Sequence, residues 1–307
     1  MPRVNPFRVV APVLAALAAA ASLAWAPAVL QPPTQGQAPA AKIPLTLPNQ
    51  PDSLKFGVMG DFGTGAAPQI EMAATMARVH QQFKFTLMLL TGDNLYGSER
   101  PQDFKKKFED PYKALIDGGV TFRAALGNHD EREQRNYKPF NMGGQLYYTY
   151  KEKNVRFFVI ESTYPDPKQM LWLEQELKNS DSDWKIAYMH HPPYCSAGRH
   201  GSDRRLREML EPLFVAYNVS VVFAGHDHVY ERTKPQKDIT YFVVGSSGKL
   251  SPGDLDSRSP LTAKGFDTDQ AFLVAEISGD QMAFNAVSKA GRVVDAGTIT
   301  RRQAPKK

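Results

Sequence analysis

Short apolar runs recur along residues 55–223, and each is followed at once by a turn that carries polar side chains. The runs cover residues 55–59, 85–90, 122–126, 184–189 and 219–223. Short runs of this kind are typical of strands that are buried in a sheet. A buried strand that ends in a polar turn exposes those polar groups at one edge of the sheet, where α/β folds bind ligands. The pattern therefore predicts a ligand site that is built from strand ends.

Helical patterns alternate with these strands. Residues 68–83, 167–178 and 203–217 predict helices, and residues 145–161 predict further strands. After residue 239 the pattern resembles half-exposed antiparallel strands, over 239–245, 271–277, 282–288 and 293–300. Residues 246–268, rich in Ser, Gly, Asp and Pro, predict a surface loop that borders the cleft. This order predicts an α/β fold, a four-layer α/β/β/α sandwich of two mixed β-sheets flanked by helices.

The five turns share side chains that can ligate metals. They read Gly-Asp-Phe-Gly at 60–63, Gly-Asp-Asn-Leu-Tyr at 92–96, Gly-Asn-His-Asp at 127–130, Met-His-His-Pro at 189–192 and Gly-His-Asp-His at 225–228. Two metal ions that lie close together repel each other, so a carboxylate with two oxygens must bridge them, and Asp93 is the candidate. Asp61 and histidines would complete the coordination of one ion. Asn128, His190 and His226 offer ligands to the other ion.

Tyr96 bears on the identity of the metals. A phenol has a pKa of about 10, so a phenolate ligand near neutral pH indicates the hard ion Fe(III) rather than Zn(II) or Mn(II). With Asp61, Asp93 and Tyr96 anionic, a trivalent and a divalent ion leave the site positive, which attracts phosphate. The alternative is that Tyr96 is a packed aromatic side chain beside a Mn, Zn or mixed pair.

Taken in order, the motifs follow the pattern GDxG, GDxxY, GNH with a following acid, VxxH and GHxH, except that Ala187 stands in place of the leading Val of VxxH, and the last one continues as GHDHVYER. The pattern resembles that of the calcineurin-like binuclear metallophosphoesterases. Tyr96, together with a first motif that lacks histidine, resembles the purple acid phosphatase branch in its small, catalytic-domain-only form. The resemblance implies a binuclear centre of Fe(III) with Fe(II), Zn(II) or Mn(II). Its implied ligands are Asp61, Asp93, Tyr96 and His228 for the ferric ion, and Asp93, Asn128, His190 and His226 for the divalent ion.

The same resemblance implies that His129 and His200 contact the substrate. It implies an acid phosphatase acting on a small-molecule phosphomonoester, in which a metal-bound hydroxide attacks in line and His200 or another acid protonates the leaving alcohol. Four alternatives stay open. His191 of the doublet is the ligand instead of His190, His200 is a solvated surface side chain, the enzyme is a phosphodiesterase, or the site is decayed and only binds phosphate or metal.

The ends of the chain differ from its body. Arg3 and Arg8 precede an apolar stretch, so residues 1–28 predict a signal peptide or an N-terminal membrane anchor and an exported protein, periplasmic or secreted. Residues 29–51, rich in Pro, Ala and Gln, predict an exposed linker, residues 52–300 the catalytic domain, and residues 301–307 a basic tail.

The formal net charge of +5 comes from these ends. Three of the 37 Lys and Arg lie in residues 1–51 and four in residues 301–307, whereas all 32 Asp and Glu lie in residues 52–300, which leaves −2 on the body. We therefore expect no nucleic-acid partner. A lone cysteine, Cys195, excludes an intrachain disulfide and favours a bacterial envelope.

Overall fold

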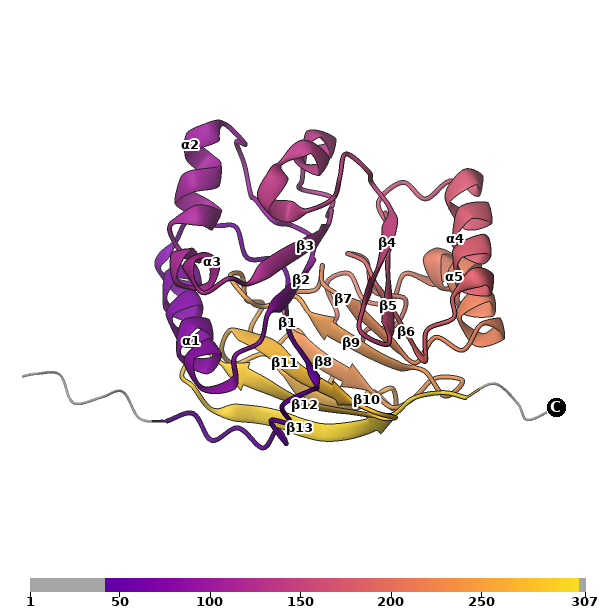
Figure 1. Ribbon diagram of the computed structural model, residues 1–307. Coiled ribbons are helices and arrows are strands. Elements are labelled where there is room, and N and C mark those ends of the chain that lie inside the picture. The colour runs from indigo at the N-terminus through magenta and orange to yellow at the C-terminus, as the bar shows by residue number, and fades with distance from the viewer. Residues whose placement is uncertain (1–41, 304–307) are drawn as a thin grey trace, which may run out of the picture. The chain divides into compact units, whose positions relative to one another are not determined.

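A computed structural model describes residues 42–303 of the chain. The predicted signal peptide or anchor over residues 1–28, the first part of the predicted linker and residues 304–307 lie outside the described residues. Two mixed β-sheets pack face to face, and helices cover the outer faces (Figure 1). Phe56 of one sheet packs edge-on against Phe157 and Phe223 of the other, with ring centroids 5.8 and 6.1 Å apart. The predicted four-layer α/β/β/α sandwich is confirmed.

The six-stranded sheet has the order β13-β12-β11-β1-β2-β3. Strands β1 to β3 are parallel to one another, and β11 pairs antiparallel with β1. The bounds are β1 Leu54–Met59, β2 Leu87–Thr91, β3 Thr121–Ala125, β11 Ala271–Ser278, β12 Gln281–Ser288 and β13 Val293–Thr300. The helices on this side (Figure 1) are α1 Ala67–Phe83, α2 Pro101–Phe104, continued by a π-helical turn Lys105–Glu109, and α3 Lys113–Asp117.

The seven-stranded sheet has the order β10-β8-β9-β7-β6-β5-β4. Its strands are β4 Tyr148–Glu152, β5 Val155–Val159, β6 Trp184–Tyr188, β7 Val221–Ala224, β8 Tyr230–Thr233, β9 Thr240–Val244 and β10 Thr262–Phe266. Helices α4 Pro167–Asn179 and α5 Arg204–Ala216 pack on its outer face through buried side chains such as Leu173 and Leu210. Two 3-10 turns, Arg132–Asn136 and Lys138–Phe140, follow β3.

Local sequence signals set the helix starts. Asp166 and Asp203 cap α4 and α5, because their carboxylates accept the backbone N–H of Gln169 and Leu206 at 2.7 and 2.9 Å. A cap of this kind contributes about 1 kcal/mol. These two helices therefore begin within one residue of the predicted positions.

The β-rich C-terminal part corrects three predictions. Residues 246–268 contain the edge strand β10, and β8 was not predicted at all. Strand β9 pairs parallel with β7 as well as antiparallel with β8. Strands β11 and β12 are buried on both faces rather than half-exposed, because other parts of the chain cover the sheet.

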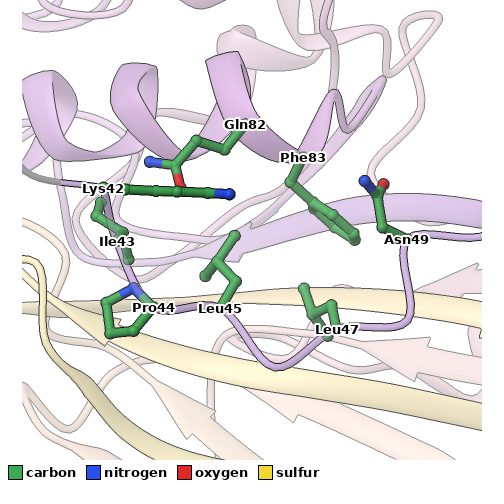
Figure 2. A pocket seen from close by; sticks show the side chains of 8 residues that line it. All are labelled: Lys42, Ile43, Pro44, Leu45, Leu47, Asn49, Gln82 and Phe83. Carbon is green, nitrogen blue, oxygen red and sulfur yellow. The ribbon is translucent and has the colours of Figure 1, made fainter.

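Part of that cover is a segment predicted to be an exposed linker. Residues 42–50 run beside the C-terminal end of α1, where Gln82 and Phe83 border a pocket together with this segment (Figure 2). Ile43 is only 1% exposed. The backbone N–H of Thr46 donates to Asn285 Oδ1 on β12 at 2.8 Å, and that of Asn49 donates to Glu276 Oε2 on β11 at 2.5 Å. The compact domain thus begins before residue 52, because this segment buries apolar side chains on the sheet.

The predicted C-terminal tail is also partly docked. The guanidinium of Arg302 donates to the backbone carbonyl of Phe214 near the end of α5 at 3.2 Å.

Candidate metal centre

Three candidate ligands lie in tight turns at strand ends. Asp61 follows β1, Asp93 follows β2 and His226 follows β7, and their φ angles are 55°, 51° and 72°. Residues other than glycine seldom adopt this left-handed region, which costs on the order of 1 kcal/mol per residue. Backbone strain of this kind gathers at functional sites, where the fold around it holds side chains in place.

Neighbouring glycines let these turns approach one another. A Cβ atom added at Gly127 would lie 2.2 Å from Asp93 Oδ1, and one added at Gly225 would lie 2.5 Å from Asp61 Oδ2. Any larger side chain would therefore displace a candidate ligand.

One group of candidate ligands lies at the ends of β1 and β2. Asp61, Asp93 and His228 each place a ligand atom within 4.8 Å of the others, and both carboxylates are buried. The Tyr96 hydroxyl is 3.2 Å from Asp61 Oδ1 and 3.3 Å from His228 Nε2. The structure thus brings together the four side chains that the resemblance places on one ion.

A second group surrounds His190. Its Nε2 lies 3.0 Å from Asn128 Oδ1, 3.1 Å from His226 Nδ1 and 3.3 Å from Asp93 Oδ1. Asp93 therefore belongs to both groups. This is the place that a bridging carboxylate requires.

The hydrogen bonds of His190 test whether these residues fit a metal ion. Its Nδ1 lies 2.9 Å from the carbonyl of Thr91, which can only accept, so the proton is on Nδ1. Burial lowers the pKa of His190 well below its usual range, so the ring is neutral and Nε2 carries a lone pair. That lone pair faces the Asp93 carboxylate oxygen at 3.3 Å. Two such atoms repel each other unless a cation lies between them, so the donor set fits a metal ion.

The acidic groups lead to the same conclusion. Burial, followed by the charge of Asp93, raises the pKa of Asp61 well above its usual range. Burial and the charges of Asp61 and Asp93 likewise raise the pKa of Tyr96 far above its usual value. Several buried acidic groups in one place are costly without a positive partner, and bound metal cations reverse both shifts.

Backbone and side-chain contacts hold the ligands. The N–H of His226 donates to Asp61 Oδ2 at 2.9 Å, and the N–H of His129 donates to Asp93 Oδ1 at 3.1 Å. Asp130 accepts from the backbone of Gly127 at 2.8 Å and of Leu95 at 3.0 Å, so it ties the turn after β2 to the turn after β3. A carboxylate next to a histidine, as Asp130 is next to His129, can orient the imidazole ring. The hydrogen bonds found for Asp130 instead fix these two turns.

The two predicted substrate contacts lie at the rim of the centre. His129 is exposed, and its ring centroid is 5.0 Å from that of Tyr96. His200 is also exposed, but its ring lies 4.2 Å from the ring of His226. Both imidazoles therefore lie beside candidate metal-binding side chains, and both remain accessible to a molecule bound at the centre.

Residues that the motifs do not include complete the surroundings. The ammonium of Lys249 lies 3.5 Å from the ring centroid of Tyr96, a cation–π contact. Ser162, after β5, contacts the His190–His191 pair. The only signal in the sequence for Lys249 was its place in the loop expected to border the cleft, and Ser162 carried no signal. His190, not His191, faces Asn128 and Asp93.

Comparisons with known proteins agree with this geometry. The profile of the calcineurin-like phosphoesterase family matches residues 54–230. A purple acid phosphatase of Glycine max is 36% identical over 234 residues, which cover 67% of this chain and 49% of that protein. Purple acid phosphatase 1 of Ipomoea batatas is 26% identical over 264 residues, which cover 76% of this chain and 54% of that protein. The chain thus spans about half the length of these two relatives.

Among solved structures, GAP50, described as the anchor in the inner membrane complex of Plasmodium, matches with a TM-score of 0.68 at 21% identity. The match covers 82% of this chain and 90% of that chain, and it shows the fold. The family profile covers more than half of this chain, and the two plant relatives named above are purple acid phosphatases. The chain therefore belongs to the calcineurin-like phosphoesterase family and is similar, within that family, to the purple acid phosphatases.

Proposed function

We propose that this protein is an exported phosphatase that hydrolyses phosphomonoesters at a binuclear centre of Fe(III) and a divalent ion, Fe(II), Zn(II) or Mn(II). The observation that carries the proposal is the position of Asp93. It is shared between a group with Asp61, Tyr96 and His228 and a group around His190. One group is rich in anionic oxygen and the other in neutral nitrogen, which suits a trivalent ion beside a divalent one.

Bound at these ligands, the metal pair would acidify water and neutralise charge on the phosphate oxygens. The residues of this chain supply the rest of the chemistry. His129 and His200 lie at the rim, within reach of a phosphoester that binds at the two groups of metal-binding side chains. Their imidazoles would hold phosphate oxygens, and His200 would donate a proton to the leaving alcohol. The positive charge of Lys249 beside Tyr96 would further favour an anionic substrate.

The decisive experiment is metal analysis with a visible spectrum of the full chain purified without added metal. We expect one iron per chain and a purple band from the bond between tyrosinate and Fe(III). Tyr96→Phe should lose the band, whereas Tyr137→Phe, a change in a tyrosine that lies away from the centre, should keep it. A colourless protein with Mn or Zn would contradict the ferric assignment.

Turnover separates an enzyme from a binding protein. Hydrolysis of an aryl phosphate by the metal-loaded protein should exceed that of a metal-stripped control, and equal rates would contradict the proposed activity. Rates on a monoester and a diester with the same leaving group should favour the monoester. The opposite preference would indicate a phosphodiesterase.

Export rests on the composition of residues 1–28. In residues 42–303, no helix combines the length and the apolar character needed to cross a bilayer. Cell fractionation with N-terminal sequencing of the recovered protein tests export. Recovery of the full-length chain in the cytosol would contradict it.

A further inference from the structure

Ser162 anchors the histidine doublet after β6. Its side chain is buried, and Oγ accepts hydrogen bonds from the backbone N–H of His190 at 3.2 Å and of His191 at 3.0 Å. A hydroxyl oxygen has two lone pairs and one hydrogen. The two N–H groups occupy both lone pairs, so only the hydrogen of Ser162 remains to be donated.

This remaining hydrogen fixes the tautomer of His191. Ser162 Oγ lies 3.0 Å from His191 Nδ1, and it can only donate there. Nδ1 therefore accepts, and the neutral ring carries its proton on Nε2. The two nitrogens point out of the ring in widely different directions, so Nε2–H is directed away from Ser162. Among the described residues 42–303, Nε2 has no hydrogen-bond partner.

The ring of His191 lies beside the second ligand group. Its centroid is 4.3 Å from that of His226 and 4.9 Å from that of His190, and one nitrogen of each ring lies within 4.8 Å of the others. His191 is also partly exposed, so a ligand in the centre can reach it. A donor without a partner thus stands next to the candidate metal site.

We propose that His191 is a substrate-binding residue, whose Nε2–H donates a hydrogen bond to a phosphoryl oxygen held at the centre. Ser162 is the positioning residue that holds the ring in this tautomer. The proposal rests on the proposed phosphatase function. It assigns different roles to the two histidines of the doublet, His190 and His191. A metal ligand must offer a lone pair. His190 offers one at Nε2, whereas the only lone pair of His191 is engaged by Ser162.

The test compares full-length, metal-loaded wild type with His191→Phe, His191→Gln and Ser162→Ala. Three quantities are measured: metals per chain, the Kd of inorganic phosphate, and kcat and KM on an aryl phosphate. The amide N–H of Gln reaches the position of Nε2, whereas Phe keeps the ring and removes the donor. His191→Phe should retain both metals and weaken phosphate binding and kcat/KM about 10- to 100-fold, the loss expected for a hydrogen bond to an anion. His191→Gln should stay within a few-fold of wild type.

A spectroscopic measurement tests the tautomer independently of activity. The imidazole nitrogen shifts of metal-free wild type, assigned with His191→Phe, should show the Nε2–H tautomer for His191. In Ser162→Ala the Nδ1–H form should appear, with a phosphate Kd between those of wild type and His191→Phe.

Several results would overturn the inference. They are loss of one metal equivalent in His191→Phe, an unchanged phosphate Kd in that variant, or an Nδ1–H tautomer in wild type. If wild type binds phosphate but hydrolyses no ester, the proposed function fails while the comparison of phosphate Kd values still decides the role of His191. If wild type binds no phosphate, both proposals fail.

Discussion

Replacing Asp130 with asparagine tests how the strand-end turns are held together. Oδ2 of Asp130 accepts from Gly127 N, Asn94 N and Asn94 Nδ2 at 2.8, 3.1 and 3.2 Å, and Oδ1 accepts from Leu95 N and Gln134 Nε2 at 3.0 and 2.7 Å. An asparagine can place its oxygen at only one of these positions. The better choice keeps three hydrogen bonds and turns the amide N–H₂ towards the two other donors.

The expected cost follows from these two lost bonds. The N–H of Leu95 is left buried without a partner, at about 1–3 kcal/mol, whereas Gln134 Nε2 keeps its hydrogen bond to Glu99 Oε1 at 2.8 Å, so Asp130→Asn should lower the free energy of unfolding by about 2 kcal/mol. Urea unfolding of the metal-free protein, followed by fluorescence, measures this difference. Asp117→Asn on α3, an exposed partner of Lys113, is the matched control and should change stability by less than about 1 kcal/mol. A loss below about 1 kcal/mol in Asp130→Asn would refute the proposed role of Asp130 as the tie between the turns.

Four further predictions follow from the structure. Asp93→Asn should abolish both metal retention and turnover because it removes the shared carboxylate, and a fully active variant would exclude the bridge. Ile43→Ala should destabilise the fold by about 2–5 kcal/mol in urea unfolding, whereas a truly exposed linker predicts a change near zero. Burial lowers the pKa of His190 well below its usual range, that of His226 to about 2 and that of His228 to about 4, so the metal-free fold should lose stability as the pH falls below about 6.5, by up to about 1.4 kcal/mol per unit for each ring. This loss is partly offset by Asp61 and Asp130, because burial raises the pKa of both, to about 7 for Asp130, and a raised carboxyl pKa works in the opposite direction; thermal unfolding between pH 5 and 7 measures the net slope. Activity on an aryl phosphate should be highest at acidic pH because the leaving-group acid must keep its proton, and a rate that still rises through pH 9 contradicts this.

The order of elements could be predicted from the sequence because the buried parallel strands are mostly apolar, and because α4 and α5 begin at recognisable aspartate caps. The strands that were missed lack such a local signal. Strand β10 is an edge strand of Thr262–Phe266 in which no residue is buried, and it is a strand because it pairs with Tyr230–Thr233 of β8. A pairing between residues so far apart along the chain leaves no period in either segment.

The prediction that β11 and β12 are half-exposed failed for a related reason. Alternation predicts one covered face, but the second face is covered when another segment happens to pack there. Here that segment includes residues 42–50, whose proline-rich composition is typical of a linker. Ile43, Leu45 and Leu47 nevertheless provide apolar side chains at alternate positions, which pack on the core. This alternation of apolar residues was present in the sequence, but the prediction of a linker followed the composition of the segment instead.

The positions of the candidate ligands were easier to predict than the role of each residue. Every motif follows a strand, and neighbouring strand ends converge, so the sequence suffices to bring Asp61, Asp93 and His190 towards one place. The sequence does not distinguish His190 from His191, which have the same chemistry at adjacent positions. The distinction comes from two groups elsewhere in the fold, one that accepts a hydrogen bond from His190 and one that donates a hydrogen bond to His191. The carbonyl of Thr91 on β2 accepts a hydrogen bond from His190 Nδ1–H and so leaves Nε2 free for a metal, whereas the hydroxyl of Ser162 after β5 donates to Nδ1 of His191 and so places the proton of that ring on Nε2. Because one group belongs to each sheet, the roles of the doublet depend on how the two sheets are packed together, and no local pattern in the chain encodes that packing.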